Sequence, residues 1–110
     1  MPLFNPPPPS TVTLPRATAV TRTTIEPPTA ATIATARELA PANPARRSIT
    51  LINNSTGTVY LDYGAAPTPT VHAAYMAPGG YFEVPGDPTV QIQGLWSAVG
   101  GTGVNVREFT

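Results

Sequence analysis

The chain has 110 residues, no formal net charge and no cysteine, and only 11% of its residues are charged. This length suits about one domain. All six basic residues are arginines and are balanced by six acids, which argues against nucleic acid and anionic lipid as partners. The lack of cysteine excludes disulfides and thiolate chemistry. The many threonines, with valine, isoleucine and tyrosine, are typical of strands and favour an all-β fold.

The first residues, MPLFNPPPP, do not contain a basic region followed by an apolar run. No window of the sequence approaches 18 uninterrupted apolar residues. We therefore expect neither a secretory signal peptide nor a membrane-spanning segment.

Prolines dominate the first part of the chain. Eight of the fifteen lie in residues 1–28, whereas all nine glycines lie from Gly57 onward. Pro6–Pro9 favour the stiff polyproline II conformation, in which residues 1–28 would span roughly 85 Å. This predicts an extended arm, residues 1–28, ahead of a β domain at 29–110. The alternative is a disordered tail, but such tails carry fewer apolar residues and more charge. The candidate partner-binding anchors of the arm are Leu3, Phe4, Val12, Leu14, Val20 and Ile25.

Within the arm, the stretch TVTLPRATAVTRTTI alternates branched and small residues. As a strand, it would place Ala17, Ala19, Thr21, Thr23 and Ile25 on one face. Such a strand can be added to the edge of a neighbour's sheet.

The domain at 29–110 has turn signals every 8 to 12 residues or so, as in a sandwich or barrel. The segment ATARELA allows one helical turn as an alternative to a strand. About seven short antiparallel strands are predicted, at 31–36, 46–52, 58–63, 72–76, 81–84, 90–96 and 104–109. The turns between them include residues 41–44, NNSTG at 53–57 and a glycine-rich turn after Trp96.

No catalytic or metal-binding motif is present. His72 is the only histidine, so a two-histidine metal site within the chain is impossible, and a packed or surface role is expected. The acids are scattered, and no serine lies in a nucleophile-elbow context. The GGTG at 100–103 lacks a following GK and is explained by a hairpin turn. Asn53 and Asn54 each begin a glycosylation sequon, but a turn is the better interpretation. We expect no enzyme activity, no cofactor and no small-molecule substrate.

Arg46 and Arg47 begin a predicted strand, so their side chains would point to opposite faces. They form a possible interface, or else a structural pair bound to acids such as Glu83 or Glu108. Trp96 can belong to an aromatic binding groove, but a single tryptophan in a small β domain is more often a core anchor.

Three motifs carry a family resemblance: RRSITLINNSTGTVYLDYG, then APGGYFEVPG, then GLWSAVGGTGVNVREF. In this order they resemble a small β domain of head-decoration (cement) and related virion structural proteins of tailed bacteriophages. The resemblance covers Arg46 to Phe109 and none of residues 1–28. It implies a β-sandwich virion protein, often trimeric, made in the host cytoplasm and located on the capsid surface. That residues 1–28 clamp major capsid subunits is inferred from the reach and composition of the arm and not from the resemblance. The resemblance carries over no catalytic residues.

The sequence therefore predicts a capsid decoration protein whose stiff arm loses little entropy when it orders on a partner. The first alternative is a tail or baseplate adaptor or host-binding module of a phage. The second is a small enzyme or inhibitor domain. The absence of lysine, the usual guard of exposed sheet edges, also predicts that the isolated protein self-associates.

Overall fold

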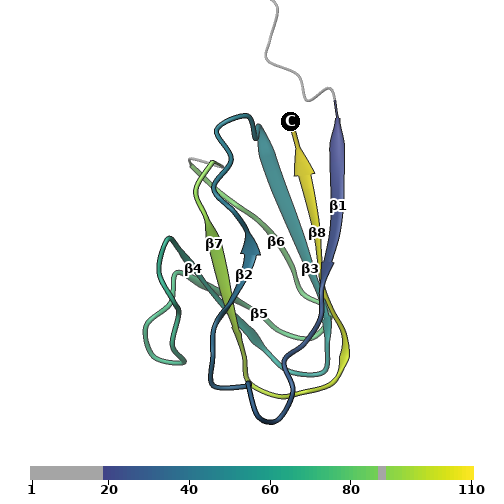
Figure 1. Cartoon of the computed structure of the whole chain (residues 1–110), viewed down its shortest axis with the longest axis vertical. Helices are drawn as coiled ribbons and strands as arrows, with labels where there is room; N and C mark the ends of the chain where they lie inside the picture. The colour runs from purple at the N-terminus through teal and green to yellow at the C-terminus, as the bar shows by residue number, and fades with distance from the viewer. Residues whose placement is uncertain (1–18, 87–88) are drawn as a thin grey trace, which may run out of the picture.

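The computed structural model describes residues 19–86 and 89–110, and within them it confirms an all-β sandwich. Eight antiparallel strands form two four-stranded sheets (Figure 1). The strands are β1 (Val20–Ile25), β2 (Arg37–Ala40), β3 (Ser48–Ser55), β4 (Val59–Tyr63), β5 (Ala74–Met76), β6 (Tyr81–Glu83), β7 (Ile92–Trp96) and β8 (Gly101–Phe109). Sheet A has the order β1-β8-β3-β6, and sheet B has the order β2-β7-β4-β5.

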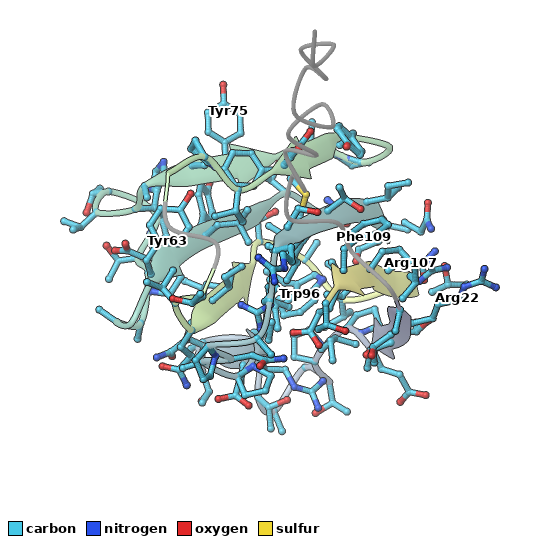
Figure 2. All side chains as sticks on the ribbon, turned by 90° about the horizontal axis from the view of Figure 1, so that it is seen from above. Arg22, Tyr63, Tyr75, Trp96, Arg107 and Phe109 are labelled. Carbon is cyan, nitrogen blue, oxygen red and sulfur yellow. The ribbon has the colours of Figure 1, made fainter. Side chains whose placement is uncertain are left out.

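The core lies between the sheets because apolar side chains alternate along the strands. In β3 the buried residues include Ile49 and Leu51, and in β4 they are Val59 and Leu61. Trp96 of β7 is 2% exposed and lies in the interior between the sheets, as Figure 2 shows. The core interpretation of this tryptophan is therefore confirmed.

Gly94 of β7 brings two core side chains close to the backbone of its strand. A Cβ atom at this position would lie 2.8 Å from Leu39 Cδ1 and 3.2 Å from Val59 Cγ1. Both approaches are tighter than ordinary packing allows. Glycine here thus lets β2 and β4 pack closely against β7.

The strand predicted at 31–36 is wrong. Residues 30–35 form turns, and the strand β2 begins at Arg37. Thr32 explains this, since its hydroxyl accepts a hydrogen bond from the Thr29 amide and its carbonyl accepts one from the Thr35 amide. Threonine side chains that bond local backbone compete with strand pairing. The helical alternative is wrong as well, because residues 36–40 of ATARELA are extended or in β2.

The turn predicted over residues 53–57 is shorter than expected, since β3 continues to Ser55. Asn53 is completely buried inside this strand. Its side-chain amide forms hydrogen bonds with backbone groups of neighbouring residues. The residue therefore satisfies buried backbone groups inside the sandwich instead of forming the turn.

The strand predicted within the arm is present as β1. It pairs with β8 of the same chain, from Val20 opposite Phe109 to Ile25 opposite Val104. Residues 20–25 of the predicted arm thus belong to sheet A, and the sandwich begins before the boundary drawn after residue 28. The reason is local: no proline interrupts residues 16–26, so the backbone can pair along this stretch.

Candidate functional site: the outer face of sheet A

The described residues contain no cluster of catalytic type. Within 19–86 and 89–110, no three or more histidine, cysteine, aspartate or glutamate side chains are grouped so that they could hold a metal ion. Burial and the carboxylate of Asp62 raise the pKa of Tyr63 above its usual value of 10.0, so its phenol stays protonated at neutral pH. His72 is packed against Tyr60, with ring centroids 4.8 Å apart.

Arg46 is a structural residue. It is 3% exposed and forms an ion pair with Glu108 of β8. The same guanidinium donates hydrogen bonds to the carbonyl oxygens of Pro41 and, over 3.0 Å, of Val90. Of the two arginines considered as an interface, Arg46 therefore serves the fold, whereas Arg47 is exposed.

The predicted arm anchors fall into two groups. Leu3, Phe4, Val12 and Leu14 lie outside the described residues. Val20 is 46% exposed, whereas Ile25 packs against the core of its own chain. Val20 is thus open to a partner, and Ile25 is occupied by its own fold.

The outward-facing side chains of sheet A form three rows across its strands. Since cross-strand partners point to the same side of a sheet, the register defines these rows. The first row is Val20, Phe109 and Ser48; the second is Arg22, Arg107, Thr50 and Glu83; the third is Thr24, Asn105, Ile52 and Tyr81. We call this surface the outer face of sheet A. Arg22, Arg107 and Phe109 project on the same side of the molecule (Figure 2).

Two arginines stand side by side in the middle row of this surface, one on the edge strand β1 and the other on its neighbour β8. Ala19 and Thr110 form a hydrogen-bonded pair, in which the amide of each residue donates to the carbonyl oxygen of the other, at 3.2 and 3.0 Å. Because such pairs alternate along an antiparallel ladder, Arg22 and Arg107 form a non-hydrogen-bonded pair, with Cα atoms about 4.5 Å apart. Their positive charges are therefore close neighbours.

The arginine pair has no carboxylate partner among the described residues. The ion pair found there joins Arg46 to Glu108. Glu83, at the end of the same row, is two strands away from Arg107, or roughly 10 Å. This exceeds the screening length of about 8 Å at physiological salt. Like charges placed directly opposite destabilise a sheet, so the pair does not serve the fold.

Apolar side chains surround the arginine pair. Val20 and Ile52 are 46% and 40% exposed, and Tyr81 is 59% exposed. A surface with two adjacent arginines and exposed apolar neighbours is suited to a protein partner that presents carboxylates.

Sequence reasoning missed Arg22 and Arg107. Period-two alternation placed Arg22 on the face opposite Thr21 and Thr23, which is where it lies. The sequence could not show that Arg107 of β8 lies opposite Arg22, because the local pattern of residues does not determine how two strands far apart in the chain align.

No protein-family model, curated protein or solved structure matches this chain. In the part of the chain that the structure describes, no helix has the length and apolar character needed to cross a bilayer.

Proposed function

We propose that this chain is a capsid decoration protein of a tailed bacteriophage, which binds the major capsid subunits and stabilises the head lattice. The observation that carries the proposal is the adjacent pair of Arg22 and Arg107 on the outer face of sheet A, which has no carboxylate partner among the described residues. A structural protein must keep a surface for its partner even where that surface weakens its own fold. The family resemblance of residues 46–109 supports the same assignment.

The three motifs of the resemblance supply most of the sandwich. The first covers β3 and β4, the second contains β6, and the third runs from within β7 to the end of β8. Arg107 lies in the third motif, whereas Arg22 comes from the segment outside the resemblance. The proposed capsid-binding surface is therefore completed by β1, which extends the proposed clamping role from residues 1–18 into the sheet.

A trimer on a repeating lattice would present three such surfaces and three arms. Each contact need only be weak, because linked contacts raise the effective concentration of the next one. This matches a surface with one charge cluster and scattered apolar side chains. On this proposal the protein acts on the capsid surface, without a cofactor and without nucleic acid or membrane as partner.

Binding to capsids tests the proposal directly. Virus heads lacking the protein are mixed with full-length protein and sedimented, and the bound fraction is measured against concentration. We expect Arg22→Glu to weaken binding by about tenfold or more, because it places a negative charge against the acidic partner surface. We expect added salt to weaken binding of the unaltered protein.

Arg37→Glu is the matched control, since it changes the net charge equally at an exposed position on β2 of sheet B, away from the outer face of sheet A. It should bind within about twofold of the unaltered protein. Equal losses for both variants would mean that net charge, rather than the arginine pair, governs binding. No binding of the unaltered protein to heads would contradict the proposal itself.

A further inference from the structure

A second surface lies on the outer face of sheet B. It is a groove of about 480 Å³ with Leu95 and Tyr60 at its base. These two residues are cross-strand partners on β7 and β4, so their side chains are neighbours on this face. Ile33 lines the groove from the turn at 30–35, and Pro67 and Pro69 line it from the loop between β4 and β5.

An aromatic contact holds the proline-containing loop in place. The ring of His72 lies 4.8 Å from that of Tyr60 and 6.1 Å from that of Tyr75. Its Nδ1 donates a hydrogen bond to the carbonyl oxygen of Thr68 over 3.0 Å, since a carbonyl only accepts. The loop is therefore tied to sheet B on both sides of Pro69, which gives the groove a fixed wall.

The chemistry of the groove fits a polyproline II segment. None of its lining residues is charged. The lining combines Tyr60 and Trp96 with prolines and aliphatic side chains, and Thr68 and Ser97 add two hydroxyl groups. Aromatic-lined grooves of this kind recognise proline-rich peptides, whose backbone is already ordered before binding. A sugar would instead require carboxylates or amides, which are missing from the lining.

The chain carries a segment that matches this groove. Pro6–Pro9 are four consecutive prolines, and no charged side chain occurs before Arg16. The segment and the groove are thus both uncharged, and both are mainly apolar. Residues 1–18 would span about 56 Å as polyproline II, which exceeds the length of any strand of the sandwich.

The groove lies far from the point at which this segment joins the sandwich. β1 begins beside Phe109, at the end where Arg46 joins Glu108 and Val90. Leu95 lies toward the other end of β7, near the turn at 30–35. Figure 1 shows the start of β1 and this turn at opposite ends of the molecule. A stiff proline run would have to reverse its direction to reach its own groove.

We infer that Pro6–Pro9 of one copy bind the groove formed by Tyr60, Leu95, Ile33 and Pro69 on sheet B of a second copy. The contact joins copies head to tail, so it closes a ring or continues along a lattice. This inference does not rest on the proposed function, because it concerns association of the protein with itself in solution.

A mixing experiment with two full-length variants tests the inference. The first variant carries Pro6→Ser, Pro7→Ser, Pro8→Ser and Pro9→Ser together and keeps its groove. The second carries Ile33→Asp and Pro69→Asp and keeps its prolines. In analytical ultracentrifugation we expect the unaltered protein to associate with rising concentration and each variant alone to remain monomeric. An equal mixture should form a dimer with one copy of each, since each supplies what the other lacks.

Val71→Asp is the control, because Val71 is 66% exposed in the same loop and does not line the groove. It should associate as the unaltered protein does. Circular dichroism checks that every variant is folded. A monomeric unaltered protein with no dimer in the mixture would overturn the inference, and so would undiminished association of either variant alone.

Peptide binding provides a second readout that does not depend on the groove variant folding. A peptide of residues 1–18 is titrated into the ¹⁵N-labelled proline-to-serine variant. We expect amide shifts at Ile33, Tyr60 and Thr68, and binding at least about tenfold weaker for the peptide with serine at positions 6–9. Shifts confined to sheet A, or no shifts, would contradict the inference.

Discussion

Asn53 is a fully buried amide that joins three segments of the backbone. Its Nδ2 donates to the carbonyl oxygens of Gly57 and Met76, each over 2.9 Å, and its Oδ1 accepts from the Ser55 amide over 2.9 Å. We expect Asn53→Ala to lower the free energy of unfolding by about 3 kcal/mol, because these backbone groups lose their partners away from water. Urea denaturation measures this change.

The neighbouring residue provides the control. Asn54 is exposed, so Asn54→Ala should change stability by less than about 0.5 kcal/mol. Similar unfolding midpoints for the two variants would show that the buried amide does not stabilise the fold.

The Arg46–Glu108 pair closes the end of the sandwich at which β7 begins and β8 ends. We expect Arg46→Met to lower the free energy of unfolding by about 3–5 kcal/mol, because it leaves a buried carboxylate without its partner. Arg47→Met, at the exposed neighbouring position, should be nearly neutral. Equal effects of the two substitutions in urea denaturation would contradict a structural role for Arg46.

Replacement of Arg22, unlike that of Arg46, should not destabilise the fold. Replacing Arg22 by threonine removes the repulsion from Arg107 and adds a residue with high strand propensity. We expect Arg22→Thr to leave the melting temperature unchanged or raise it slightly while it weakens capsid binding. A clear fall in melting temperature would mean that this arginine stabilises the sheet, and the argument for a partner surface would lose its basis.

For individual residues, the sequence predicts the environment of those whose residue type alone determines it. A single tryptophan was expected in the core, and an acid such as Glu108 was among those expected to pair with Arg46; the structure shows both. Asn53 and the pair of Arg22 and Arg107 were not foreseen. Their roles depend on which backbone groups and side chains lie opposite them, and this follows from register between distant strands.

Among the elements, β1 is unusual because it is exposed on both faces except at Ile25. Its attachment to β8 depends on backbone pairing and on the hydrogen bond from Thr24 Oγ1 to Asn105 Oδ1 at 2.9 Å. Gly103 of β8 permits this close approach. Its φ is 101°, and a Cβ there would lie 2.0 Å from the carbonyl oxygen of Ile25.

We therefore expect Gly103→Ala to displace β1 while the rest of the sandwich stays folded. Backbone strain and the clash should lower hydrogen-exchange protection of residues 20–25 and leave that of β4 and β7 nearly unchanged. Gly79→Ala, also at positive φ but with open space around it, controls for backbone strain alone. Unchanged protection of β1 in Gly103→Ala would show that the contact is looser than the structure indicates.

The open edge of β1 is also the best candidate for strand-mediated aggregation. The edge strands β5 and β6 have three residues each, and β2 has four with a register shift, whereas β1 has six with neither proline nor lysine. Long regular edges invite pairing between molecules. Hydrogen-bonded and non-hydrogen-bonded pairs alternate between β1 and β8. Thr24, like Arg22, belongs to a non-hydrogen-bonded pair, so its amide points away from β8.

We expect Thr24→Pro to reduce light scattering during prolonged incubation. It blocks the outer edge and removes the side-chain hydrogen bond to Asn105, but it removes no backbone hydrogen bond to β8. Thr23→Pro should instead detach β1, because the Thr23 amide faces β8. Identical behaviour of the two variants would contradict the assigned ladder.

At the scale of elements, alternation predicted the strands β3, β4, β6, β7 and β8 to within a few residues. It placed a strand at 31–36 where Thr32 forms turns, because a side chain that bonds local backbone has no signature in apolar periodicity. It also predicted a strand within residues 17–25 and left open whether this strand pairs in its own chain or with a neighbour; its partner β8 lies in the same chain.

For the whole molecule, composition and turn spacing were sufficient to predict a sandwich, since threonine-rich alternation with frequent turns has few other solutions. The sandwich leaves two surfaces unexplained by folding: the arginine pair on sheet A and the uncharged groove on sheet B. We propose that the first binds the capsid and the second a neighbouring copy. Together they would join copies of this chain to the lattice and to one another.

Labelling of intact virus particles tests the central claim most directly. An antibody raised against the recombinant protein is applied to intact particles of the phage that, on the proposed function, encodes this chain, and is located by negative-stain electron microscopy. The proposed function requires label distributed over the head. Label confined to the tail or its tip would instead support the adaptor or host-binding alternative, and particles without label would contradict a virion role.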